Sequence, residues 1–288
     1  MDIIAVLHVF PIIAYVFIFL LGLVIGSFLN VVIHRLPLMM YRDWHEQCQD
    51  FAKEHPNPPT EKLNLMLPRS RCPYCKHTIS AKENIPIISY FLQRGKCKHC
   101  QGKISPRYPV IEGLSAILGI LILLHFGISW QTVGGLILTW SLVALSFIDL
   151  DEKLLPDSLT LFLLWLGLFL NLFSLYTDIN SAVIGAIAGY VSLWGFTAIF
   201  NFITKKQGMG HGDFKLFAVF GAWLGWQLLP FILLAASVVG AIVGIILIAC
   251  KKHQRADPIP FGPYLALAGW ICLVFGEHIT HHYLQFFH

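Results

Sequence analysis

Long apolar runs separated by short polar segments dominate this chain. A helix that crosses a bilayer needs about 20 mostly apolar residues, and eight runs reach or approach that length. They are Phe10–Ile33, Tyr108–Phe126, Thr132–Ile148, Ser158–Tyr176, Ala182–Ile203, Phe214–Leu229, Phe231–Cys250 and Phe261–Phe275. The sixth run is short and its boundary with the seventh rests on Pro230, so seven helices is the alternative. The pattern predicts an all-α polytopic membrane protein with about eight transmembrane helices.

The composition supports this prediction. Hydrophobic residues make up 56% of the chain and charged residues 12%, whereas soluble domains carry about 25% charged residues. The first apolar run has no basic segment before it and continues to Ile33, which is too long for the core of a cleaved signal peptide. We therefore expect a membrane protein whose first helix is retained.

The basic residues are distributed unevenly, and this predicts the topology. A polar block from Arg35 to Arg107 holds thirteen of the twenty Lys and Arg residues. With eight helices and an external N-terminus, all twenty fall on one side, which the positive-inside rule makes the cytoplasm. The predicted parts are a first helix (residues 1–34), a cytoplasmic domain (35–107) and a transmembrane domain (108–288). The net charge of +4 gives no indication of a nucleic-acid partner, and none is expected.

Four of the seven cysteines form two C-x-x-C pairs in the cytoplasmic block. The pairs are Cys72/Cys75 and Cys97/Cys100, with twenty-one residues between them. This is close to zinc-ribbon spacing, and four thiolates fill the tetrahedral coordination of a structural Zn²⁺. The alternative is two disulfides or unrelated thiols, but a reducing cytoplasm disfavours disulfides. We predict a zinc site, with the adjacent His77 and His99 on the surface rather than among the ligands.

Two aspartates at the ends of apolar runs are the candidates for chemistry. Asp149 closes the third run, and Asp151 and Glu152 lie further toward water. Ionisable residues at membrane depth are costly and often functional, although this segment could also be a plain polar turn. Asp157 then suits the N-cap or first turn of the next helix.

Asp213 follows three alternate glycines, Gly208, Gly210 and Gly212, at the start of the sixth run. Glycines allow close backbone approach, but a flexible turn before a first-turn acid is the simpler alternative. We expect the nearby Lys215 to be a topological anchor rather than a base. If Asp149 and Asp213 approach each other, they can share a proton. One carboxylate then activates water and the other polarises a peptide carbonyl, which is peptide hydrolysis without a metal.

The motifs together resemble a known family. Gly210-His211-Gly212-Asp213 matches the G-x-G-D signature of intramembrane-type aspartyl peptidases, and the segments Ile148–Asp151 and Leu154–Asp157 resemble the first-aspartate motif of bacterial type IV prepilin leader peptidases. Gly26–Pro37, the four-cysteine domain and Ile104–Glu112 match the same family in order along the chain. The resemblance covers essentially the whole sequence.

This resemblance implies two activities in the bacterial inner membrane, with the active site facing the cytoplasm. The enzyme would cleave the basic leader from type IV prepilins and type II secretion pseudopilins after a glycine. It would then methylate the new N-terminal amine with S-adenosylmethionine. Asp149 and Asp213 would be the peptidase pair, and Gly95 in the cytoplasmic domain would belong to the methyltransferase. The methyl donor rests on the resemblance alone, because the chain has no G-x-G-x-x-G fingerprint.

Three alternatives stay open at this point. A proton-coupled transporter could use the two aspartates as a relay, but these acids lie at the membrane edge and no internal repeat is evident. A zinc-binding membrane scaffold without chemistry is the second alternative. A peptidase without methyltransferase activity is the third.

Overall fold

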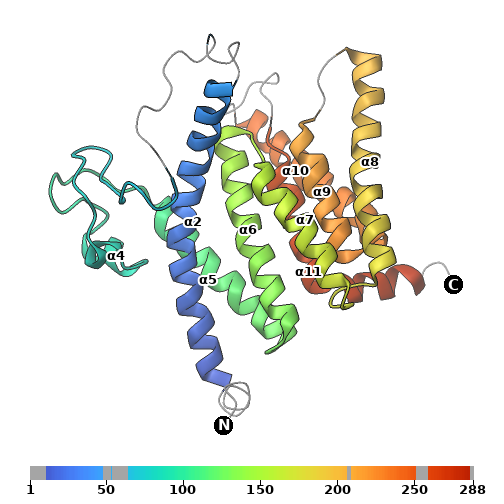
Figure 1. Ribbon diagram of the computed structural model, residues 1–288, viewed down its shortest axis with the longest axis horizontal. Coiled ribbons are helices and arrows are strands. Elements are labelled where there is room, and N and C mark those ends of the chain that lie inside the picture. The colour runs from blue at the N-terminus through green and yellow to red at the C-terminus, as the bar shows by residue number, and fades with distance from the viewer. Residues whose placement is uncertain (1–10, 48–52, 54–63, 206–208, 251–258, 286–288) are drawn as a thin grey trace. The chain divides into compact units, whose positions relative to one another are not determined.

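Helices account for the regular structure of the described chain (Figure 1). The computed structural model describes residues 11–47, 53, 64–205, 209–250 and 259–285. Its long helices are α2 (Pro11–Gln47), α5 (Arg107–Phe126), α6 (Trp130–Glu152), α7 (Asp157–Asn171), α8 (Ile179–Thr204), α9 (His211–Leu224), α10 (Leu229–Ala249) and α11 (Gly262–Gln285). Short helices are η1 (Ala81–Asn84), α4 (Ile88–Leu92) and η2 (Trp226–Leu228). The eight long helices follow the eight predicted runs in order, which confirms the all-α class.

The helices differ in their capacity to cross a membrane. In the described residues, five segments are long and apolar enough to do so: α2, α5, α6, α8 and Trp226–Leu247. Two apolar helices are shorter, Asp157–Asn171 and Gly262–Gly276. The protein is therefore a membrane protein by helix length and composition, and the number of eight crossings stays a prediction.

The predicted boundary between the sixth and seventh runs at Pro230 is wrong, because the first of the two helices ends at Gly225. Gly225 has a φ of 81°, a left-handed conformation that glycine adopts without steric cost, and it ends α9. Pro230 is the second residue of α10, where its missing N–H is not needed for a helical bond. The two runs therefore form separate helices.

The first helix is longer than its apolar run. It continues past Ile33, through Pro37, to Gln47. The Arg35 side chain donates hydrogen bonds to the carbonyls of Asn64 (2.8 Å) and Pro68 (2.5 Å), which attaches the later polar segment to the helix. Residues 48–52 and 54–63, among them Cys48, lie outside the described residues, as does Gly208.

Backbone contacts divide the chain into two compact units, Met1–Thr132 and Val133–His288. In the first unit, α2 packs directly against α5. A Cβ atom on Gly22 would lie 2.6 Å from Cα of Ala116, and one on Gly26 would lie 2.6 Å from Cα of Glu112. Small residues permit such close helix packing in lipid, and these two glycines therefore set the α2–α5 distance.

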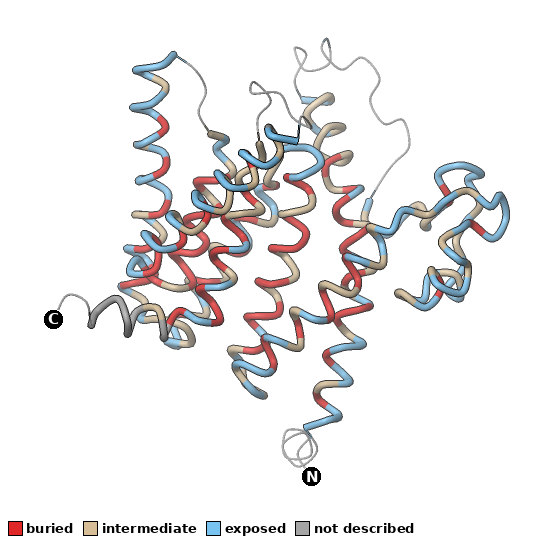
Figure 2. The backbone as a smooth tube through the Cα atoms, turned by 180° about the vertical axis from the view of Figure 1, so that it is seen from behind, coloured by how far each residue is buried: buried red, intermediate tan, exposed pale blue. Residues whose placement is uncertain are grey.

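Helix α9 is the centre of the second unit and packs against α7, α8 and α11. Nine of the ten residues from Phe214 to Trp223 are buried, with Lys215 the exception, and Asp213 is buried as well. Figure 2 shows the buried positions of this unit gathered where helices lie against one another. The backbones of α8 and α9 touch, because a Cβ on Gly185 would lie 2.5 Å from the carbonyl oxygen of Gly221 and a Cβ on Gly221 would strike the carbonyl of Gly185.

A buried asparagine ties the end of α9 to α7. The Asn171 side-chain amide donates to the carbonyls of Ala222 (2.8 Å) and Trp223 (3.1 Å), while its oxygen accepts from the N–H groups of Tyr176 and Thr177. The last carbonyls of a helix have no partner within the helix. One side chain thus satisfies two helix-end carbonyls and two loop N–H groups.

The α8–α9 contact gives a test of this packing. Gly221→Ala places a methyl group against the Gly185 backbone, and we expect overpacking to lower stability by about 1–3 kcal/mol. Gly195→Ala in α8 is the matched control, because a Cβ there meets nothing within 4 Å. Thermal unfolding in detergent should show a lower Tm for the first variant only. Equal Tm values would refute the close contact.

Candidate active sites

Asp149 lies near the end of α6 and is 5% exposed. The backbone N–H of Gly262, at the start of α11, donates to its Oδ2 over 2.9 Å. Asp151 and Glu152 are exposed, which agrees with the predicted order of depth. The position of Asp149 therefore depends on a residue 113 positions away in the chain, which was not predicted from the sequence.

Asp213 is the third residue of α9 and is 8% exposed. Gly210 is the N-cap residue, and a Cβ atom there would lie 3.6 Å from Oδ2 of Asp213. A Cβ on Gly212 would lie 2.7 Å from Cβ of Leu155. The predicted close backbone approach is thus present at Gly212, whereas His211 between the two glycines is exposed.

Leu155 lies beside the two glycines that neighbour the aspartates. Its side chain fills the space beside Gly212, next to Asp213, and beside Gly262, which holds Asp149. The carboxylates are near enough for the charge of Asp149 to act on Asp213. The end of α6 and the starts of α9 and α11 therefore bring both acids into one region of the second unit. Two buried carboxylates that approach closely can share one proton and act as acid and base.

Lys215 and Asp157 form an ion pair beside this region. Lys215 Nζ lies 2.6 Å and 2.7 Å from the two carboxylate oxygens of Asp157. Asp157 is a first-turn residue of α7, and Pro156 is the N-cap. The pair joins the starts of α7 and α9, which gives Lys215 a contact within the protein in addition to its expected role as an anchor.

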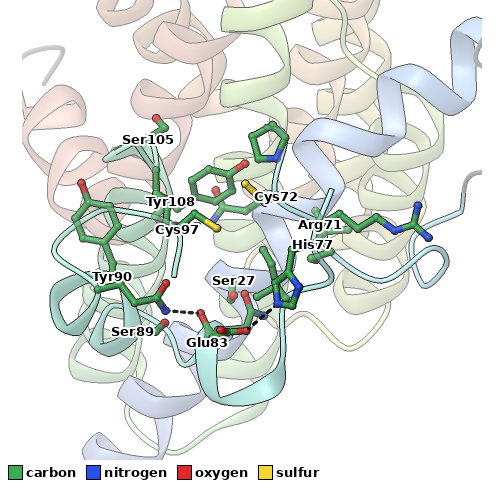
Figure 3. A pocket seen from close by; sticks show the side chains of 18 of the residues that line it. Ser27, Arg71, Cys72, His77, Glu83, Ser89, Tyr90, Cys97, Ser105 and Tyr108 are labelled. Atoms are coloured by element: carbon green, nitrogen blue, oxygen red, sulfur yellow. Dashed lines mark hydrogen bonds and ion pairs between the residues drawn. The ribbon is translucent and has the colours of Figure 1, made fainter. Parts of the chain in front are cut away.

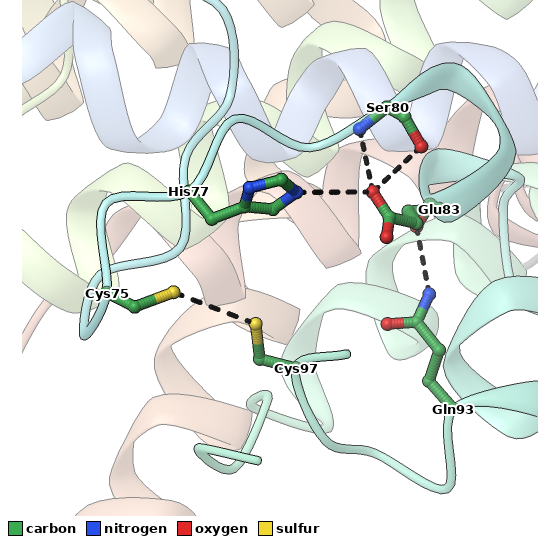
Figure 4. Close-up of polar contacts among 6 residues, drawn as sticks. All are labelled: Cys75, His77, Ser80, Glu83, Gln93 and Cys97. Atoms are coloured by element: carbon green, nitrogen blue, oxygen red, sulfur yellow. Dashed lines mark hydrogen bonds and ion pairs between the residues drawn. The ribbon is translucent and has the colours of Figure 1, made fainter. Parts of the chain in front are cut away.

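The four cysteines of the two pairs form one cluster in the first unit. All four sulfur atoms lie within 4.8 Å of one another. Cys72 and Cys100 Sγ are 3.8 Å apart. Cys75 and Cys97, the pair drawn in Figure 4, have their Sγ atoms 4.0 Å apart. Tetrahedral Zn²⁺ with Zn–S bonds of about 2.3 Å needs S–S separations of about 3.8 Å, whereas a disulfide needs about 2.05 Å. The donor set fits a tetrahedral metal ion, and the four cysteines are free thiols.

The two cysteine turns have the same backbone pattern. Cys72 N–H donates to the His77 carbonyl and Cys97 N–H to the Gly102 carbonyl, over 2.9 and 2.8 Å. Lys76 and Gln101 occupy equivalent left-handed positions, with φ of 60° and 59°. Each turn thus presents two sulfur atoms in the same way.

The thiols of this cluster differ in acidity. The pKa of Cys72 is lowered to about 7, chiefly because the backbone N–H of Cys75 donates to its sulfur. The pKa of Cys75 is raised to about 11, because desolvation and the neighbouring thiols outweigh a lowering bond from the His77 backbone. The Cys72 thiolate therefore forms readily, and a bound divalent cation would favour the thiolate form of the other cysteines in the cluster.

A second group beside the cysteines consists of His77, Glu83 and His99, whose ligand atoms also lie within 4.8 Å of one another. The two imidazole rings stack with centroids 3.5 Å apart. The Glu83 carboxylate accepts from the N–H (3.0 Å) and hydroxyl (2.8 Å) of Ser80 (Figure 4). These bonds lower the pKa of Glu83. His99 is exposed as predicted, while His77 is half-buried.

Gly95 lies in a tight turn and has a φ of 67°. Its N–H donates to the Tyr90 carbonyl (2.9 Å), and its carbonyl accepts from Ile104 (2.8 Å). A Cβ atom at this position would lie 3.1 Å from the Tyr90 hydroxyl oxygen. A larger residue would therefore strain the backbone and press on Tyr90.

Tyr90 lines a cavity of about 770 Å³ in the first unit (Figure 3). Residues of α2, the cysteine turns, α4 and the start of α5 surround it, among them Ser27, Arg35, Cys72, Tyr90, Tyr108 and Glu112. Its volume is in the range of small-molecule sites. Sequence reasoning did not find this cavity, because its walls come from four separate segments.

Comparisons with known proteins match both units of the chain. The family model described as bacterial peptidase A24 N-terminal domain matches residues 20–126, and the type IV leader peptidase family matches residues 136–245. Each match lies within one compact unit.

Curated relatives are similar over nearly the full length. Prepilin leader peptidase/N-methyltransferase of Stutzerimonas stutzeri is 53% identical and is covered over 92% of each chain. Proteins of the same name from Aeromonas salmonicida (52%, with 96% of each chain) and Pseudomonas aeruginosa (51%, with 93% of this chain and 92% of the relative) are also similar. No solved structure matches the chain.

The ion pair near the aspartates can be tested by a double-mutant cycle with Lys215→Met and Asp157→Asn. The Asp157 side chain is 58% exposed, so water screens the pair, and we expect a coupling free energy of about 1 kcal/mol or less. Unfolding of the four proteins in detergent measures it. A coupling of several kcal/mol would show that the pair is shielded from solvent.

Proposed function

Because the chain belongs to the type IV leader peptidase family, we propose that it cleaves the leader from type IV prepilins and type II secretion pseudopilins after a glycine. It then methylates the new N-terminal amine with S-adenosylmethionine. The observation that carries the peptidase proposal is that Asp149 and Asp213 are buried acids at two helix ends and that Leu155 lies beside the glycines that flank both. Because the chain belongs to this family, we prefer this function to the transporter and the scaffold alternatives.

In the proposed cleavage, Asp149 and Asp213 act as a pair on one water molecule. One carboxylate takes a proton from the water, and the other, protonated, donates to the oxygen of the scissile carbonyl. The proton taken from the water then passes to the leaving amine when the peptide C–N bond breaks. The N–H of Gly262 donates to one oxygen of Asp149, and the Leu155 side chain packs beside Gly212 and Gly262.

The cleavage site faces the cytoplasm of a bacterial inner membrane in this proposal. Asp149 is followed by Lys153, and Asp213 follows Lys205 and Lys206, so both acids lie at helix ends that carry basic residues. Basic residues concentrate in cytoplasmic loops. This supports the same side of the membrane for both carboxylates.

Cys72, Cys75, Cys97 and Cys100 hold a structural Zn²⁺ in this proposal. Four thiolates complete the tetrahedral coordination and leave no position for a substrate. Of the described residues 64–105, the buried ones are Cys72, Ser89 and Cys97. A segment with so small an apolar core needs another source of stability, and a metal supplies it.

The methyl donor occupies the cavity of about 770 Å³ in this proposal. S-adenosylmethionine supplies the methyl group when bound, and the cavity lining offers both basic and acidic side chains for its charged groups. Gly95 has an indirect role in this proposal. The absence of a side chain at this position leaves room for the Tyr90 side chain, which lines the cavity. Incubation of the purified enzyme with a prepilin and labelled S-adenosylmethionine separates a peptidase from an enzyme with both activities.

We predict that Asp149→Asn and Asp213→Asn each lower the rate of leader cleavage by at least about 100-fold, because each variant removes one half of the acid–base pair. Asp151→Asn is the matched control, since this acid is exposed two residues from Asp149. Cleavage of a prepilin by each purified variant is followed on gels. Normal cleavage by either of the first two variants would overturn the assignment.

We predict one zinc per chain in the purified protein, and its loss when Cys72 and Cys75 are both changed to Ser. Elemental analysis measures the metal content. Cys272→Ser should retain the zinc, because Cys272 is a buried thiol of α11 in the other unit. A parent protein without zinc would contradict the site.

A further inference from the structure

Glu112 is a buried acid that leader cleavage does not use. It lies in the second turn of α5, is 7% exposed and lines the cavity of the first unit. Its Cα is the atom that a side chain on Gly26 of α2 would strike. Helix packing therefore holds this carboxyl group in one place.

The known partners of Glu112 are neutral hydrogen-bond donors. The Ile87 N–H donates to its Oε2 over 2.7 Å, and the Ser27 side chain is a second partner. No Lys, Arg or His pairs with it in the described part of the chain. Burial of a charged carboxylate is costly without a paired cation.

Two other charged groups of the cavity have partners of their own. Glu83 is bound to the N–H and hydroxyl of Ser80. The Arg35 guanidinium is bound to the carbonyls of Asn64 and Pro68. Glu112 is thus a buried carboxyl group that faces a space large enough for a ligand, and a cation is the ligand that would compensate its carboxylate form.

We propose that Glu112 binds the protonated α-amine created by leader cleavage and takes its proton before methyl transfer. This inference rests on the proposed methyltransferase function. An α-ammonium group has a pKa of about 7.7–8.0, so most of it is protonated at neutral pH and has no lone pair with which to attack.

The reaction balances with the groups named. A proton moves from the ammonium nitrogen to the Glu112 carboxylate, which frees the nitrogen lone pair. The nitrogen attacks the methyl carbon of the sulfonium donor, the N–C bond forms and the S–C bond breaks. The electron pair of that bond stays on sulfur, which leaves a neutral thioether and a methylated ammonium group. Loss of the Glu112 proton to water restores the carboxylate.

A structural role for Glu112 makes a different prediction. Ile87 has a φ of 60°, which is rare for a β-branched residue, and Glu112 accepts its N–H. Glu112→Gln keeps an oxygen that can accept this bond but removes the charge and the capacity to take a proton. The variant therefore separates support of Ile87 from chemistry on an amine.

The experiment uses the full-length enzyme with Glu112→Gln, Glu112→Asp and the surface control Glu46→Gln. Leader cleavage, zinc content, the Kd for S-adenosylmethionine and methylation of a precleaved pilin are measured for each. We expect Glu112→Gln to lower methylation by at least about 100-fold, with cleavage, zinc and the Kd unchanged. Glu112→Asp keeps a carboxylate and should retain more methylation than the Gln variant.

Three results would overturn the inference. Normal methylation by Glu112→Gln would assign the residue a structural role or none. A parallel rise in the Kd for S-adenosylmethionine would place the carboxylate against the methyl donor. If Glu112→Gln loses zinc or folds poorly, Glu112→Asp decides: methylation no better than that of the Gln variant would rule out a role for the charge. A parent enzyme that cleaves but never methylates would instead refute the proposed second activity.

Discussion

Backbone contact between α8 and α9 is the constraint on which the peptidase site depends. Within lipid, apolar surfaces gain little by leaving their surroundings, so helices associate through close packing and polar contacts. Gly185 and Gly221 allow the two backbones to touch, and Asn171 closes the far end of α9. Because α9 begins with the turn that carries Asp213, these contacts also set the position of that carboxylate.

The aspartate pair is assembled from helix ends. Helix ends offer backbone N–H and carbonyl groups without partners in the helix, and Asp149 uses the N–H of Gly262 in this way. A site made of helix ends needs accurate packing of each helix, because a shift of one turn would separate the acids. Leu155, between Gly212 and Gly262, occupies the space in which such a shift would occur.

Within the first unit, residues 64–105 are organised around sulfur rather than around an apolar core. The two cysteine turns repeat the same hydrogen bonds and left-handed residues, which brings four sulfur atoms to the separations that a tetrahedral ion needs. The same segments form walls of the cavity in which we place methyl transfer. Metal binding and the shape of that cavity are therefore physically coupled, although the metal takes no part in the proposed chemistry.

Local patterns in the sequence determined the class of the protein and its candidate residues. Apolar run length predicted the long helices, C-x-x-C spacing predicted the cysteine cluster, and the glycines before Asp213 predicted a close backbone approach. Each of these signals is contained in a few neighbouring residues.

The tertiary structure decided the contacts between distant segments: Gly262 with Asp149, Lys215 with Asp157, and Glu112 with Ile87. It also placed a helix end at Gly225 instead of Pro230. The physical reason is that apolarity and turn preference act along the chain, whereas the neighbours of a buried side chain depend on how whole helices pack.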